Sequence, residues 1–124
     1  MGKVYLRGHR KRNLLDYSYA EDFFWGNYWD AKNDLEENIL SKAPADKEFW
    51  WIKKYEFDGD VQNKQLFVVF YQAKSMGKYP GRRMHRVLAT KAKAEKIIKE
   101  NEPSGFIEDF FTERMWFQET WKVI

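Results

Sequence analysis

With 124 residues and a mass of 15.1 kDa, the chain is long enough for one domain with a substantial core. It contains no cysteine, which excludes disulfides, zinc–thiolate sites, iron–sulfur ligation and thiol catalysis. Its hydropathy shows neither a membrane-spanning run nor the apolar core of a signal peptide, so the sequence predicts a cytoplasmic protein without membrane contact.

The charged residues are segregated along the chain, although the net charge is only +3. Residues 1–13 and 61–99 carry net charges of +5 and +9, whereas residues 14–60 and 100–124 carry −7 and −4. Two interpretations stay open. Either the basic and acidic segments face each other in the fold, or the two basic segments converge on one face that binds an anion.

The first elements are a short strand and an aromatic helical turn. Residues 3–7 predict a strand within a basic N-terminal arm of about 1–13. Ser18 and Glu21 have the spacing of a capping box, in which a hydroxyl and a carboxylate satisfy the free N–H groups at a helix start. This spacing predicts a helical turn over residues 23–25.

A longer helix is predicted next. From Tyr28 onward, apolar residues recur at the spacing of one helix face. We expect this helix to end near Ser41, before Pro44, because proline cannot continue a helix. The predicted buried stripe consists of Tyr28, Ala31, Leu35 and Ile39.

The middle of the chain is rich in strand-forming residues. Residues 48–57 and 65–72 predict two strands, and the turn signal at 58–60 between them predicts that they form a hairpin. Residues 83–89 fit either a third strand or the start of a long helix, and the strand is preferred.

The last part of the chain predicts a helix and a strand. Thr90 is expected to be the N-cap of a helix over residues 91–101, with Ala94, Ile97 and Ile98 inward. A short helical turn at 106–111 and a strand at 114–123 follow. The order β-α-β-β-β-α-β predicts a single α+β domain with two main helices and an antiparallel or mixed sheet of about four strands.

Aromatic residues make up 19% of the chain, and their placement is unusual. Residues 49–52, 66–71 and 115–117 do not alternate between apolar and polar, so these strands need cover on both faces. The cover is supplied by the chain itself, by a second subunit, or by a partner that binds an exposed aromatic platform. The sequence therefore favours a homo-oligomer, with a dimer as the first choice.

The segment 74–86 is the first candidate binding site, because it combines basic side chains with glycine, tyrosine and proline. Guanidinium groups bind phosphate through paired hydrogen bonds, and tyrosine stacks on bases. The spacing differs from that of a P-loop. The predicted ligand-binding residues of this segment are Lys74, Lys78, Tyr79, Arg82, Arg83, His85 and Arg86.

The N-terminal arm supplies a second basic group, consisting of Arg7, Arg10 and Arg12. Basic chain ends commonly contact phosphate backbones without reading sequence. The alternative is that the arm is only a charged start of the chain.

The two histidines, His9 and His85, lie within these basic segments. If the protein were an enzyme, they would be its candidate acid–base pair for phosphodiester cleavage. Their wide separation along the sequence gives no reason for them to meet. No metal site or cofactor is expected from the carboxylate spacing.

These features predict a non-catalytic protein that binds a phosphate-bearing partner, a nucleic acid or a nucleotide. The alternative is a protein inhibitor of the phage or plasmid type, an anti-defence factor, that binds a protein target through an aromatic surface. A small phosphodiesterase or ribonuclease is the third hypothesis. The small size, the absence of cysteine and the aromatic content resemble those of accessory proteins of phages or plasmids, but no motif indicates a family.

Overall fold

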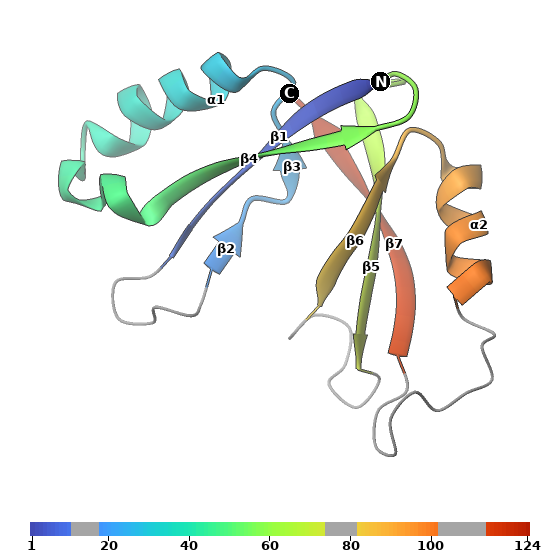
Figure 1. Cartoon of the computed structure of the whole chain (residues 1–124). Helices are drawn as coiled ribbons and strands as arrows, with labels where there is room; N and C mark the ends of the chain where they lie inside the picture. The colour runs from blue at the N-terminus through green and yellow to red at the C-terminus, as the bar shows by residue number, and fades with distance from the viewer. Residues whose placement is uncertain (11–17, 74–81, 102–113) are drawn as a thin grey trace. The chain divides into compact units, whose positions relative to one another are not determined.

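A computed structural model describes residues 1–10, 18–73, 82–101 and 114–124 (Figure 1). The strands are β1 (Gly2–Arg10), β2 (Ser18–Ala20), β3 (Phe23–Phe24), β4 (Trp50–Phe57), β5 (Gln65–Ala73), β6 (Arg83–Leu88) and β7 (Arg114–Val123). The helices are α1 (Tyr28–Asp34), a π-helix (Leu35–Leu40), a 3-10 helix (Pro44–Phe49) and α2 (Lys91–Asn101). These elements confirm the predicted α+β class and both main helices.

The chain divides into two compact units, which are described separately. Unit 1 comprises Met1–Glu56 with Lys122–Ile124, and unit 2 comprises Phe57–Trp121. The end of β7 thus belongs to unit 1, where Lys122 and Val123 pair in parallel with the two residues of β3. Because β5 and β6 pair antiparallel, the sheet of order β3-β7-β5-β6 is mixed, as predicted.

Unit 1 is built on a second sheet, of order β2-β1-β4, with α1 beside β1 (Figure 1). β1 and β2 pair antiparallel, with Gly8 opposite Ala20. The strand β1 continues to Arg10, beyond the predicted end at residue 7. The apolar side chains buried in this unit are Val4, Leu6, Phe24, Trp25, Ala31, Leu35 and Leu40.

The predicted helical turn after Ser18 is wrong, because this segment forms β2 and β3 instead. Backbone pairing overrides the local capping signal: Tyr5 and Trp25 exchange two N–H···O bonds of 2.8 Å each. The true N-cap of α1 is Asn27, whose side-chain oxygen accepts hydrogen bonds from the N–H groups of Trp29 and Asp30.

The helix predicted from Tyr28 is present, but its second half is a π-helix. The N–H of Ser41 bonds to the carbonyl of Glu36, five residues back. This wider turn rotates the helix surface, so Leu40 is buried where Ile39 was expected.

The predicted hairpin of residues 48–57 and 65–72 is also wrong. β4 lies next to β1, whereas β5 lies between β7 and β6. The segment between β4 and β5 makes its own tight turn, closed by a bridge between Gln62 and Gln65. The strong strand signals were correct, but they did not specify the pairing.

In unit 2, α2 covers one face of the β5–β6 sheet. Val69 and Leu88 from the strands pack with Ala94 and Ile97 from α2, and Trp116 packs against this cluster. Thr90 caps α2 as predicted: its hydroxyl accepts a hydrogen bond of 3.3 Å from the N–H of Lys93. The core thereby fixes which residues of β5, β6 and β7 share the face on which α2 packs.

Candidate functional site

The part of this face not occupied by α2 carries aromatic and basic side chains. We call it the basic–aromatic face and define it by Tyr71, Arg83, His85, Arg86 and Trp116. Neighbouring strands bring these residues together, since the order is β7-β5-β6. Arg83 lies opposite Tyr71, and Arg86 lies opposite Val69, a residue of the α2-facing cluster.

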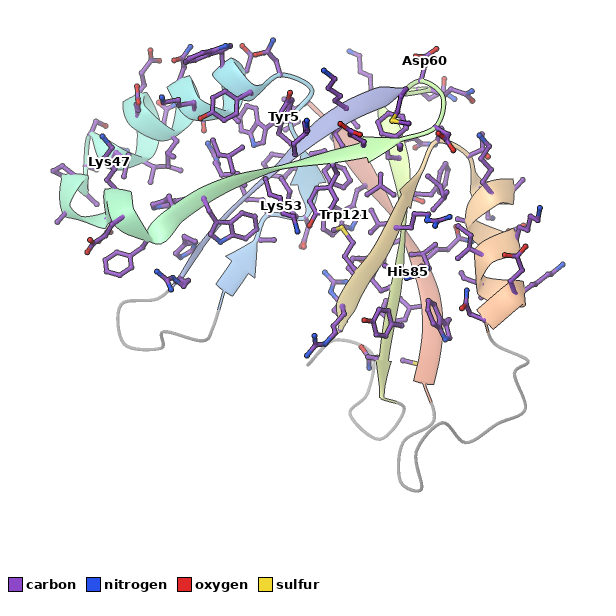
Figure 2. All side chains as sticks on the ribbon, viewed as in Figure 1. Tyr5, Lys47, Lys53, Asp60, His85 and Trp121 are labelled. Carbon is purple, nitrogen blue, oxygen red and sulfur yellow. The ribbon has the colours of Figure 1, made fainter. Side chains whose placement is uncertain are left out.

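His85, labelled in Figure 2, lies at a β-bulge of β6. The register passes from Val69 opposite Arg86 to Phe70 opposite Met84, so His85 is the extra residue of β6. A bulge interrupts the ladder and redirects a side chain, and bulges are common at sheet edges and next to binding sites. β6 is an edge strand of its sheet, whose order is β3-β7-β5-β6.

Three rings from three strands contact one another on the basic–aromatic face. The ring centroids of Tyr71 and Trp116 are 5.1 Å apart, at an interplanar angle of 31°. The ring of His85 stands edge-on to Trp116, at 5.0 Å and 89°. His85 also contacts Tyr71 edge-on, at 6.1 Å. Tyr71 and Trp116 are half-buried, whereas His85 is exposed.

The charge on this face is positive. Arg83 and Arg86 are exposed, and within the described part of unit 2 neither is paired with a carboxylate. The described residues of β5, β6 and β7 include one acidic side chain, Glu119. Glu119 is held by Arg82 at 2.7 Å. Among the described residues of this sheet, Arg83 and Arg86 are thus exposed cations without a carboxylate partner.

His85 is held toward its neutral form. Its pKa is lowered from the ordinary value of 6.5, first by partial burial and second by the positive charge of Arg86. A neutral imidazole presents both an N–H donor and an acceptor, and its ring can stack. At neutral pH the positive charge of this face thus comes from the two arginines.

Arg82 lies on the opposite face of the sheet, although it was predicted to act with Arg83 and Arg86. Its guanidinium carbon is 4.3 Å from the centroid of the Phe70 ring, and Phe70 stacks on Phe117 at 5.5 Å. Since successive residues of a strand point to opposite faces, this position separates Arg82 from Tyr71 and Arg83. Arg82 holds a structural ion pair with Glu119.

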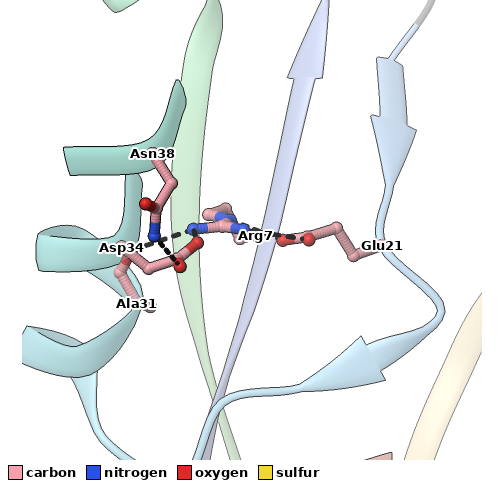
Figure 3. Close-up of polar contacts among 5 residues, drawn as sticks. All are labelled: Arg7, Glu21, Ala31, Asp34 and Asn38. Carbon is pink, nitrogen blue, oxygen red and sulfur yellow. Dashed lines mark hydrogen bonds and ion pairs between the residues drawn. The ribbon is translucent and has the colours of Figure 1, made fainter. Parts of the chain in front are cut away.

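Arg7 is also structural, because it is only 3% exposed and its guanidinium is bound within unit 1 (Figure 3). It donates hydrogen bonds to both carboxylate oxygens of Glu21 and one of 2.8 Å to Asp34. A further hydrogen bond goes to the carbonyl of Ala31. The guanidinium also lies over the ring of Trp25. We therefore leave Arg7 out of the anion-binding set.

The remaining residues predicted for the N-terminal arm occupy β1 or lie beyond it. Arg10 is exposed at the end of β1, so the expected arm is a sheet strand up to this point. His9 stacks on Trp50, with ring centroids 4.6 Å apart. His9 belongs to unit 1 and His85 to unit 2.

Four predicted residues lie outside the described part of the chain, namely Lys74, Lys78, Tyr79 and Arg12. Sequence reasoning missed two members of the basic–aromatic face, Tyr71 and Trp116. Strand alternation could have indicated both residues, because odd-numbered residues of β5 share a face with even-numbered residues of β7. Predicting this shared face from alternation requires the order of the strands, which the sequence did not specify.

The described residues contain no group of three or more His, Asp or Glu side chains that could hold a metal ion. Among the same residues, none of the helices combines the length and apolar character needed to cross a membrane. Searches against family models, curated proteins and solved structures found no match to this chain.

Proposed function

We propose that the protein binds nucleic acid through the basic–aromatic face, with Arg83 and Arg86 contacting backbone phosphates. The observation that carries the proposal is the exposed arginine pair on an edge strand of the basic–aromatic face, because Glu119, the one acidic side chain among the described residues of β5, β6 and β7, is bound to Arg82 on the opposite face. A carboxylate on that face would repel phosphate and compete for the arginines. Guanidinium groups form strong, charge-assisted hydrogen bonds to phosphate oxygens.

A nucleic acid explains this face better than an isolated nucleotide does. The rings and arginines are distributed over three neighbouring strands of one sheet. Small-molecule sites are usually concave and enclose most of the ligand. A chain of phosphates instead gains affinity by contacting several cations along an open surface.

The direct test is binding of a fluorescent oligonucleotide, measured by anisotropy at low salt. The Arg83→Ala/Arg86→Ala variant should bind at least about tenfold more weakly, because each charge-assisted hydrogen bond contributes about 1.5 kcal/mol or more. Replacement of both arginines by lysine should restore only part of the affinity, since lysine lacks the two-pronged geometry.

The matched control is Lys53→Ala/Lys54→Ala on β4. It removes the same formal charge from exposed positions of unit 1. If both double variants weaken oligonucleotide binding equally, binding depends on net charge alone. This result would contradict the assignment of the phosphate-binding residues to β6. Absence of any binding by the wild type at low salt would reject the proposal as a whole.

The inhibitor alternative has one observation in its favour. Trp29 on α1 is 61% exposed, and the Lys32 ammonium lies 5.3 Å from the centroid of its ring. Exposed tryptophans are frequent anchors of protein–protein interfaces. If nucleic-acid binding is absent, Trp29→Ala is the variant to test against a candidate protein target, where a loss of about 2 kcal/mol would mark an anchor.

A further inference from the structure

We infer that the ring cluster of Tyr71, His85 and Trp116 stacks on unpaired bases, so that the preferred ligand is a single-stranded nucleic acid. This inference rests on the proposed function, and it names the class of nucleic acid that the same face selects. The arginines explain attraction to any phosphate chain, whereas the rings add a contact that only accessible bases can make.

The three rings of the cluster lie at the protein surface, where Tyr71 and Trp116 are half-buried and His85 is exposed. Trp116 is anchored against the packed residues beneath α2, which fixes its ring. The ring of Tyr71 is tilted by 31° against the ring of Trp116, and both side chains are half-buried. An apolar core alone would not need His85 in this position, yet the bulge of β6 brings this polar, exposed ring into contact with both neighbours.

The spacing of charges and rings also fits a single strand. On β6, Arg83 precedes the ring-bearing His85 by two residues, and Arg86 follows it directly. A strand lying across this face can place its bases on the rings while its phosphates meet the guanidinium groups. In a duplex the bases are stacked on one another inside the helix, so the rings would remain unused.

The inference can be tested on the wild-type protein alone. An oligothymidylate, an abasic strand with the same number of phosphates, and a duplex are compared by anisotropy in the same buffer. The oligothymidylate should bind about fivefold or more tightly than the abasic strand, because base–aromatic stacking contributes about 1–3 kcal/mol per base. It should also bind more tightly than the duplex.

Two variants of Trp116 then test whether the preference for strands with bases depends on the ring cluster. Trp116→Leu keeps an apolar side chain against α2 but removes the ring, whereas Trp116→Phe keeps a ring. Trp116→Leu should lose the preference for bases over the abasic strand, and Trp116→Phe should retain most of it. Trp29→Leu in unit 1 is the matched control and should leave the preference unchanged.

The outcomes separate this inference from the proposed function. If the three ligands bind equally well and Arg83→Ala/Arg86→Ala weakens all of them, the phosphate site stands and the stacking inference fails. If the duplex binds best, the inference fails in the same way. If the wild type binds none of the three at low salt, the proposed function itself fails.

Discussion

A buried guanidinium must find acceptors for its N–H groups, and Arg7 shows how unit 1 supplies them. The two carboxylates come from separate parts of the chain, with Glu21 after β2 and Asp34 at the end of α1. Asn38 donates a further hydrogen bond to Asp34 (Figure 3). Arg7 thus joins β1 to α1 and to the segment between β2 and β3.

Replacement of Arg7 by methionine should therefore destabilise the protein. It would leave two carboxylates that are only 23% and 32% exposed without their cation. Breaking a fully buried pair costs about 3–5 kcal/mol, so we expect about 2–3 kcal/mol at these partly exposed sites. Urea unfolding measures the change. Lys54→Met, in an exposed pair with Glu56, should change stability by less than about 1 kcal/mol, and equal effects would contradict the account.

The same residue sets part of the acid sensitivity. The hydrogen bond from Arg7 lowers the pKa of Asp34 below its ordinary value of 3.8. A lowered folded-state pKa gives stability that is present above the unfolded value and is lost as pH falls through the folded value. The difference in unfolding free energy between wild type and Arg7→Met should therefore shrink from neutral pH to below about pH 4. A difference that is constant with pH would rule out this linkage.

At the scale of single elements, α2 offers the simplest test. Thr90 accepts a hydrogen bond from the N–H of Lys93, and its carbonyl accepts one from the N–H of Ala94. Thr90→Ala should lower stability by about 1 kcal/mol, because a backbone donor of the first turn loses its partner. Thr90→Ser keeps the hydroxyl and should have a much smaller effect in thermal unfolding. If both variants behave alike, the cap does not stabilise α2.

The turn before β5 contains backbone strain that glycine would relieve. Asn63 and Lys64 have φ angles of 55° and 53°, the left-handed values that a type I′ turn requires at both central positions. Lys64→Gly should raise stability by about 0.5 kcal/mol, since a side chain in this conformation costs about 1–2 kcal/mol. Lys54→Gly, within β4, should instead lower it. A lower unfolding midpoint for Lys64→Gly would contradict this reading of the turn.

The elements differ in how far the sequence determined them. The bounds of α2 and β7 agree with the prediction, because Thr90 supplies a start signal and residues 114–123 carry a continuous strand pattern. The segment at 18–25 was mispredicted, because its conformation depends on pairing with Tyr5 and with the chain end. Such pairing joins residues far apart in sequence, and local spacing does not encode it.

At the scale of the whole molecule, β5 is buried on both faces within one chain, whereas residues 50–52 of β4 and 115–117 of β7 are half-buried. Val68 and Val69 point to opposite faces of β5, and each is 0% exposed. This agrees with the alternative in which the chain itself covers both faces. Self-association stays a prediction, and sedimentation at high concentration tests it: a 15.1 kDa species alone would exclude a dimer.

The candidate site was only partly predictable. Composition alone indicated an anion site near Arg83, His85 and Arg86. It could not separate these residues from Arg82, because that distinction comes from which face of β6 each side chain occupies. It also could not place Trp116 beside His85, since that contact depends on the order of the strands.

The most direct test of the central claim is the salt dependence of binding to a single strand. For the wild type, the logarithm of affinity should fall linearly with the logarithm of salt concentration, with a slope of about 0.7 per phosphate contact. In Arg83→Ala/Arg86→Ala the slope should be shallower by about 1.4, while Lys53→Ala/Lys54→Ala should keep the wild-type slope. Identical slopes for all three proteins, or no binding at low salt, would contradict the claim that the β6 arginines hold a nucleic acid.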